Sequence, residues 1–73
     1  MTSIVRTSDD LVALVRARRR ELGLTQEQLA GVVGVHRTFI AYFETGRRNV
    51  SLDTALRVVQ ALGLDVELRP RGE

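Results

Sequence analysis

The sequence predicts a mainly α fold, in which four short helices are followed by one β-strand. Four segments carry apolar residues at helical spacing, and each is followed by a glycine, where a left-handed helix end costs least. These glycines are Gly23, Gly34, Gly46 and Gly63. After the last of them the period of the apolar residues falls from about 3.6 to about 2, as is typical of a strand. A chain of 73 residues suffices for one small domain, and we take residues 1–73 as that domain.

The first helix is expected from about residue 8 to residue 22. Thr7 or Ser8 can cap its start, and the two aspartates that follow are favourable near the positive end of a helix. Because Asp9 and Asp10 are adjacent, they point in different directions, and we interpret them as helix-start residues rather than as a catalytic acid pair. The apolar face of this helix is expected to comprise Leu11, Leu14, Val15 and Leu22.

The second helix opens at Thr25, whose hydroxyl can cap it while Gln28 reaches back in a capping box. Its apolar face is expected to comprise Leu29, Ala30 and Val33, and it ends before Gly34.

The third helix is expected over about residues 36 to 45, with Ile40 and Phe43 on its buried face. Two short helices joined by a tight turn have the dimensions of a helix-turn-helix, here about residues 25–45, whose second helix enters the major groove of DNA.

The fourth helix opens at Ser51, and its buried residues are expected to be Leu52, Leu56, Val59 and Leu62. The strand covers about residues 64–69, where apolar and polar residues alternate, and Pro70 ends it. A single strand leaves its backbone groups unpaired, so we expect it to pair across a homodimer through Leu64, Val66 and Leu68. The sequence leaves open a second short strand at Ile4 and Val5, and pairing of the C-terminal strand with it, in the same chain or the partner, is the alternative.

The composition argues against catalysis, metal binding and a membrane span. There is no cysteine and one histidine, no glycine-rich phosphate loop is present, and no apolar run approaches the roughly 20 residues that a span needs. The chain also starts without the apolar stretch of a secretory signal. We therefore expect a cytoplasmic protein that is not an enzyme and uses no cofactor and no metal.

The charge pattern restricts how the chain could meet nucleic acid. The net charge is only +2, although the chain carries 11 basic residues, all of them arginine. Binding would therefore depend on arginines gathered on one face rather than on bulk charge.

Three consecutive motifs resemble the phage-repressor (Xre/Cro-C1) helix-turn-helix family, from about Val15 to Gly63. They are Leu24-Thr-Gln-Glu-Gln-Leu-Ala30, Gly34-Val-His-Arg-Thr-Phe-Ile-Ala-Tyr-Phe-Glu-Thr-Gly46 and Arg47-Arg-Asn-Val-Ser-Leu52. The tail, Ala61-Leu-Gly-Leu-Asp-Val-Glu-Leu-Arg-Pro70, resembles the HipB-like antitoxin subgroup, in which a strand after the fourth helix pairs with its copy. The turn 47–51 and the start of the third helix also resemble controller proteins of restriction-modification systems.

The resemblance implies a sequence-specific DNA-binding transcriptional regulator, of antitoxin-repressor type, that binds a palindromic operator as a homodimer. The implied partners are double-stranded DNA, a second copy of the chain and, for an antitoxin, a cognate toxin protein. A restriction-modification controller is the alternative within the same class. A module that neutralises a partner protein, with DNA binding secondary, is the alternative from a different class.

The family pattern places Arg37, Thr38, Ala41 and Tyr42 on the side of the third helix that faces bases. Arg37 is the strongest candidate, because its guanidinium matches guanine O6 and N7, with a phosphate contact as the alternative. Phe39 either packs on the second helix or touches a thymine methyl or sugar.

Phosphate contacts are expected from Gln26, His36, Thr45, Arg47 and Arg48. For Gln26 the resemblance supplies this role, while His36 could instead cap the third helix. The resemblance also pairs Arg19 with Glu44, as a structural ion pair that fixes the third helix against the first.

Overall fold

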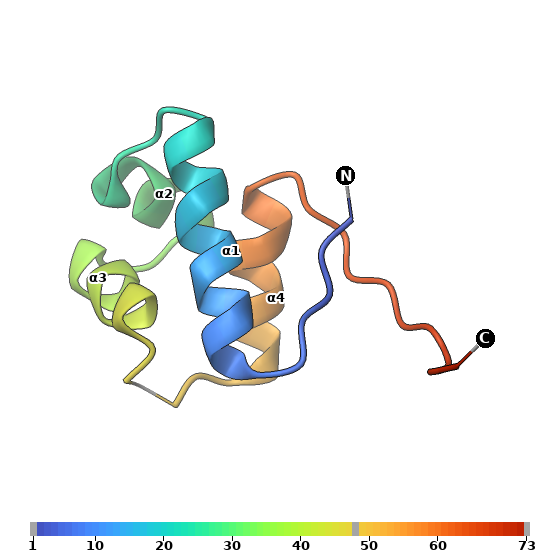
Figure 1. Cartoon of the computed structure of the whole chain (residues 1–73). Helices are drawn as coiled ribbons and strands as arrows, with labels where there is room; N and C mark the ends of the chain where they lie inside the picture. Colours follow the sequence, from blue (N-terminus) through green and yellow to red (C-terminus); the bar gives the residue numbers. More distant parts are fainter. Residues whose placement is uncertain (1, 48, 73) are drawn as a thin grey trace.

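The computed structural model describes residues 2–47 and 49–72 and is mainly helical, as the sequence predicts (Figure 1). Its helices are α1 (Ser8–Glu21), α2 (Gln26–Val33), α3 (Arg37–Thr45) and α4 (Leu52–Ala61). Figure 1 shows α1 in the middle of the molecule, with α2 and α3 on one side of it and α4 behind it. The segments that precede α1 and follow α4 both lie on the side opposite α2 and α3.

Local side-chain bonds fix where the helices begin. The capping box predicted at α2 is confirmed, since Thr25 Oγ1 accepts from the Gln28 backbone N–H and Gln28 Oε1 accepts from the Thr25 N–H. Thr7 and Asp10 form a second box at the start of α1. The backbone N–H groups of Arg6 and Thr7 donate to the Asp10 carboxylate and lower its pKa.

All four helices contribute to one apolar core. Its buried residues are Val15, Leu29, Ala30, Val33, Ile40, Phe43, Val58, Val59 and Leu62. The apolar face predicted for α2 is therefore confirmed in full, as are Ile40 and Phe43 of α3.

Two residues of the predicted core are wrong, and one core residue was missed. Leu22 caps the end of α1 and is 44% exposed, and Leu52 is the first residue of α4 and is 74% exposed. Val58, which the spacing did not single out, is fully buried. Periodicity identifies a helix face, but it does not show how far neighbouring helices extend over that face, so the ends of the pattern are its weakest part.

Two arginine side chains, Arg18 and Arg57, each cap the C-terminal end of a neighbouring helix. Arg18 Nε of α1 donates to the Leu62 carbonyl at the end of α4, over 3.1 Å. Arg57 Nη2 of α4 donates to the Val33 carbonyl at the end of α2. The last carbonyls of a helix have no partner within it, and they carry partial negative charge, so a cationic donor stabilises them.

We expect Arg57→Ala to lower the free energy of unfolding by about 1 kcal/mol, because it removes the donor to the end of α2. Urea melts followed by circular dichroism measure this loss. Arg20→Ala is the matched control, since Arg20 is an exposed arginine of α1 and its loss should change stability by no more than about 0.5 kcal/mol. Equal losses in the two variants would contradict a capping role for Arg57.

The predicted C-terminal strand does not form in the single chain, and no described residue belongs to a strand. Leu64 packs partly against the core, but Val66 and Leu68 are 54% and 92% exposed. Ile4 and Val5 are exposed as well, so the possible second strand is also not formed. A strand needs a second strand to bond its backbone, and this chain alone supplies none.

Candidate nucleic-acid interface

The turn between α2 and α3 is built around a left-handed glycine. Gly34 ends α2 with φ +85°, a conformation that favours glycine because it has no Cβ, and its N–H donates to the Ala30 carbonyl. His36 then caps α3, as its Nδ1 accepts from the Thr38 backbone N–H over 3.1 Å. The two helices therefore follow one another with only three residues between them, residues 34–36.

A second left-handed glycine ends α3 beside the start of α1. Gly46 has φ +72°, and a Cβ built on it would lie 2.9 Å from Asp9 Oδ1.

The inner face of α3 packs on the core. Ile40 and Phe43 are buried there, and the Phe39 and Phe43 rings lie 6.2 Å apart. Half-buried Phe39 is thus placed beside the core.

The residues expected to contact bases share one face of α3. Arg37, Thr38 and Tyr42 are exposed, and Ala41 is half-buried between them. At 3.6 residues per turn, positions 37, 38, 41 and 42 lie within one half of the helix circumference. The structure therefore brings all of these candidates together on one surface.

The residues expected to contact phosphate do not share one helix face. The Thr45 hydroxyl donates to the Tyr42 carbonyl over 2.6 Å and accepts from the Arg47 N–H over 3.3 Å, so it holds the turn that follows α3. Arg47 is exposed in that turn, and Arg48 lies outside the described residues. Gln26 is half-buried at the start of α2.

A buried ion pair ties α1 to the end of α3. Arg19 Nε lies 2.6 Å from Glu44 Oε2, and Arg19 Nη2 lies 2.9 Å from Glu44 Oε1, so the contact is bidentate. Arg19 and Glu44 are 9% and 5% exposed. The two residues that the family resemblance pairs therefore do meet, in the interior of the domain.

The ion pair shifts the titration of both partners. The hydrogen bond to Glu44 raises the pKa of Arg19. Burial alone would raise the pKa of Glu44, but the hydrogen bonds from Arg19 and Gln26 outweigh it, so this pKa lies below its usual value of 4.5. The folded state therefore favours the ionised carboxylate.

This shift predicts a pH dependence of stability. A lowered carboxylate pKa contributes stability that is fully present above the unfolded value of 4.5 and is lost as the pH falls through the folded value. The difference in unfolding free energy between wild type and Glu44→Gln should therefore be constant near neutral pH and shrink on acidification, because protonated Glu44 resembles glutamine. Urea melts between pH 7 and about pH 3 measure this difference. A difference that stays constant over the whole range would contradict the shift.

The geometry thus defines a small helical domain with a helix-turn-helix that presents one exposed face of its second helix. The chain belongs to the helix-turn-helix domain family, whose sequence profile matches residues 10–72. This family and the relatives below are regulators rather than enzymes, and the chain is accordingly a helix-turn-helix regulator.

Several known proteins are similar to it. Over 73 residues, all of this chain and 96% of the relative, it is 38% identical to an uncharacterized HTH-type transcriptional regulator, y4mF, from Sinorhizobium fredii. It is 44% identical to control protein C.SmaI from Serratia marcescens over 52 residues, which is 71% of this chain and 62% of the relative. Solved structures of a HipA-HipB-O2-O3 complex and of a HipB-O4 20mer complex contain chains similar to it, with TM-scores of 0.87 and 0.86. In both, the identity is 26%, and the match covers 96% of this chain and 99% of the other.

Two contacts of this region were not expected from the sequence. The Gln26 side chain donates to Glu44 Oε1, and Arg57 caps the end of α2. Within residues 2–47 and 49–72, no three His, Asp or Glu residues are grouped so as to hold a metal, and no helix is long and apolar enough to cross a membrane.

Proposed function

We propose that this chain is a sequence-specific DNA-binding repressor of antitoxin type, which binds a palindromic operator as a homodimer. The observation that carries the proposal is the exposed face of α3, on which Arg37, Thr38, Ala41 and Tyr42 stand together. Buried Ile40, Phe43 and Glu44 hold α3 against the rest of the domain, so its exposed face has a fixed orientation. The likeness to HipB chains solved as complexes with 20mers supports this proposal.

Direct reading of bases falls mainly to Arg37. It lies in the first turn of α3, the part of a recognition helix that reaches base edges, and its guanidinium can donate two bonds to one guanine. Thr38, Ala41 and Tyr42 add polar and methyl contacts along the same groove. Gln26, His36, Arg47 and Arg48 contact phosphates on either side, and Thr45 does so by turning its hydroxyl away from the Tyr42 carbonyl.

A second candidate function within the same class is that of a restriction-modification controller, which the 44% identity to C.SmaI favours. The HipA-HipB complex supports the antitoxin reading instead, and with it a cognate toxin as partner. Copurification of the product of the adjacent gene separates the two readings. Capture of a toxin supports the antitoxin function. An adjacent gene that encodes a restriction enzyme, whose product does not bind this chain, supports the controller function.

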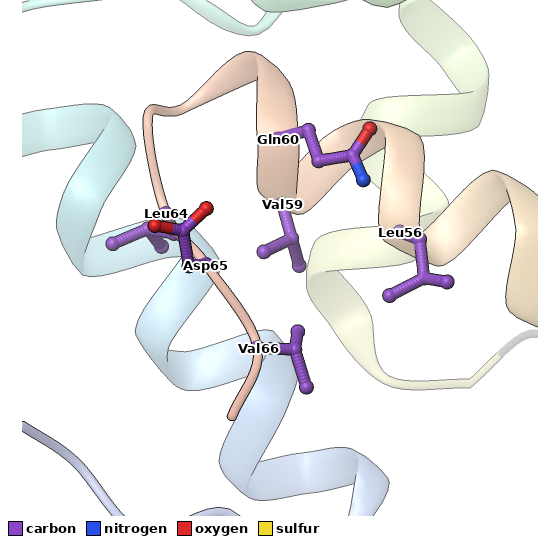
Figure 2. A pocket seen from close by; sticks show the side chains of 6 residues that line it. All are labelled: Leu56, Val59, Gln60, Leu64, Asp65 and Val66. Atoms are coloured by element: carbon purple, nitrogen blue, oxygen red, sulfur yellow. The ribbon is translucent and has the colours of Figure 1, made fainter. Parts of the chain in front are cut away.

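The dimer is proposed to form through the C-terminal segment. Figure 2 shows a groove between α4 and this segment, and its volume is about 370 Å³. Its lining comprises Leu56, Val59, Gln60, Leu64, Asp65 and Val66. Pairing of residues 64–69 with the same residues of a second copy would satisfy their backbone groups and cover the apolar side chains among those that line the groove.

The proposed roles of Arg37 and Arg47 predict opposite effects on binding. Arg37→Ala should cost about 1 to 3 kcal/mol on the cognate site and much less on random DNA, because a base contact is specific. Arg47→Ala should weaken both to the same degree and reduce the slope of affinity against salt by about 1, because a phosphate contact releases a counterion. Fluorescence anisotropy with the intergenic DNA next to the gene and with a random-sequence duplex measures both. Equal losses on the two duplexes for Arg37→Ala would assign Arg37 to the backbone.

A further inference from the structure

One buried carboxylate joins three helices. Glu44 Oε2 accepts from Arg19 Nε of α1, and its Oε1 accepts both from Arg19 Nη2, over 2.9 Å, and from Gln26 Nε2 of α2, over 3.2 Å. Arg19 Nη1 also donates to the Leu24 carbonyl over 2.8 Å, in the loop that leads into α2. The start of α2 is therefore held twice, through its loop backbone and through the Gln26 side chain.

The hydrogen bond to Glu44 fixes the direction in which the rest of the Gln26 amide points. A glutamine amide carries two N–H donors and one carbonyl acceptor, and here one donor is used toward Glu44. The second N–H and the carbonyl oxygen consequently point away from the carboxylate, and the half-buried side chain still reaches solvent.

The same helix end offers backbone donors. N–H groups in the first turn of a helix have no partner within the helix, and the Thr25 hydroxyl accepts that of Gln28, one residue beyond Glu27. The N–H groups of Gln26 and Glu27 therefore point along the helix axis, as in helix ends that bind phosphate.

We infer that Glu44 is a positioning residue, whose carboxylate, held by Arg19, orients the Gln26 amide toward a DNA phosphate at the start of α2. The inference rests on the proposed DNA-binding function and assigns to the ion pair a part in affinity in addition to stability. Without Glu44 the long Gln26 side chain would sample several rotamers, and ordering it on DNA would cost affinity.

A double-mutant cycle on DNA affinity tests this inference. Gln26→Ala removes the amide, while Glu44→Asp keeps the charge that faces Arg19 and draws the carboxylate back by one methylene from Gln26. The probe is a random-sequence duplex, since a phosphate contact does not depend on sequence. Each single variant is expected to weaken binding about fivefold to tenfold, as for one hydrogen bond, and the double variant to bind within about twofold of Gln26→Ala.

Arg57→Ala serves as the matched control, because Arg57 caps the other end of α2 and does not touch Gln26. Its effect on affinity should be the same with and without Gln26. If the effects of Glu44→Asp and Gln26→Ala multiply in the double variant, or if Gln26→Ala binds like wild type, the positioning role is wrong although DNA binding stands. A wild-type chain that binds neither the random duplex nor the intergenic DNA overturns the proposed function as well.

A second readout does not use DNA. It therefore remains informative even if Glu44→Asp binds DNA poorly only because its fold is less stable. The side-chain amide signal of Gln26 in nitrogen-15 spectra is assigned by its loss in Gln26→Ala. In folded Glu44→Asp this signal should move toward the position of a glutamine amide in the unfolded chain, whereas an unchanged signal would contradict orientation by Glu44. Melting curves show whether the variant is folded at the temperature used.

Discussion

Truncation after Leu64 is expected to convert the proposed dimer into a monomer and to abolish the proposed preference for a palindrome. Leu64 packs partly against the core, so a chain that ends there keeps its helices covered. Residues 65–73, which include exposed Val66 and Leu68, are lost. Two recognition helices must lie about 34 Å apart to enter successive major grooves, and only a dimer can place them so.

A single substitution tests the same interface with less disturbance. Val66→Pro removes a backbone donor and is expected to weaken the ribbon strongly, whereas Val66→Thr keeps both the donor and the branched side chain and should dimerise like wild type. Sedimentation equilibrium at micromolar concentrations measures the association. A wild-type monomer, or dimers that survive both the truncation and Val66→Pro, would contradict pairing through this segment.

Loss of either partner of the buried ion pair is expected to be the largest single effect on stability. Arg19→Ala leaves the Glu44 carboxylate buried without its main partner, and Glu44→Ala does the same to the guanidinium. Removing one member of a buried pair typically costs about 3 to 5 kcal/mol, a large part of the stability of a small domain.

The double variant distinguishes a coupled pair from two independent residues. Arg19→Ala with Glu44→Ala should lose less than the sum of the single losses, because no charge is then left unpaired in the interior. Urea melts at low temperature, where the weakened variants keep a folded baseline, measure the three losses. Small and additive losses, of about 0 to 1 kcal/mol each, would instead indicate an exposed pair.

The features that the sequence predicts well depend on neighbours in the chain. The Thr25 and Gln28 capping box lies within four residues, and the left-handed ends at Gly34 and Gly46 depend on the residue itself. The exposed face of α3 follows from helical spacing and from the family resemblance. Each of these features needs no knowledge of how the helices pack.

The features that were missed depend on packing or on a second chain. Arg18 reaches Leu62 across 44 positions, and Arg57 reaches Val33 across 24, so no local pattern indicates either cap. The bond from Gln26 to Glu44 arises only where α1, α2 and α3 meet. The C-terminal strand is the opposite case: the sequence predicts it, but it does not form in the structure, because a single chain supplies no partner strand.

The most direct test of the account is the affinity of the full chain for the intergenic DNA next to its gene, measured beside a scrambled duplex of the same length and composition. The account predicts binding of two protomers to one palindromic site, typically about a thousandfold or more tighter than to the scrambled duplex and weakening steeply with salt. Equal affinity for the two duplexes, or no binding to either, would contradict it.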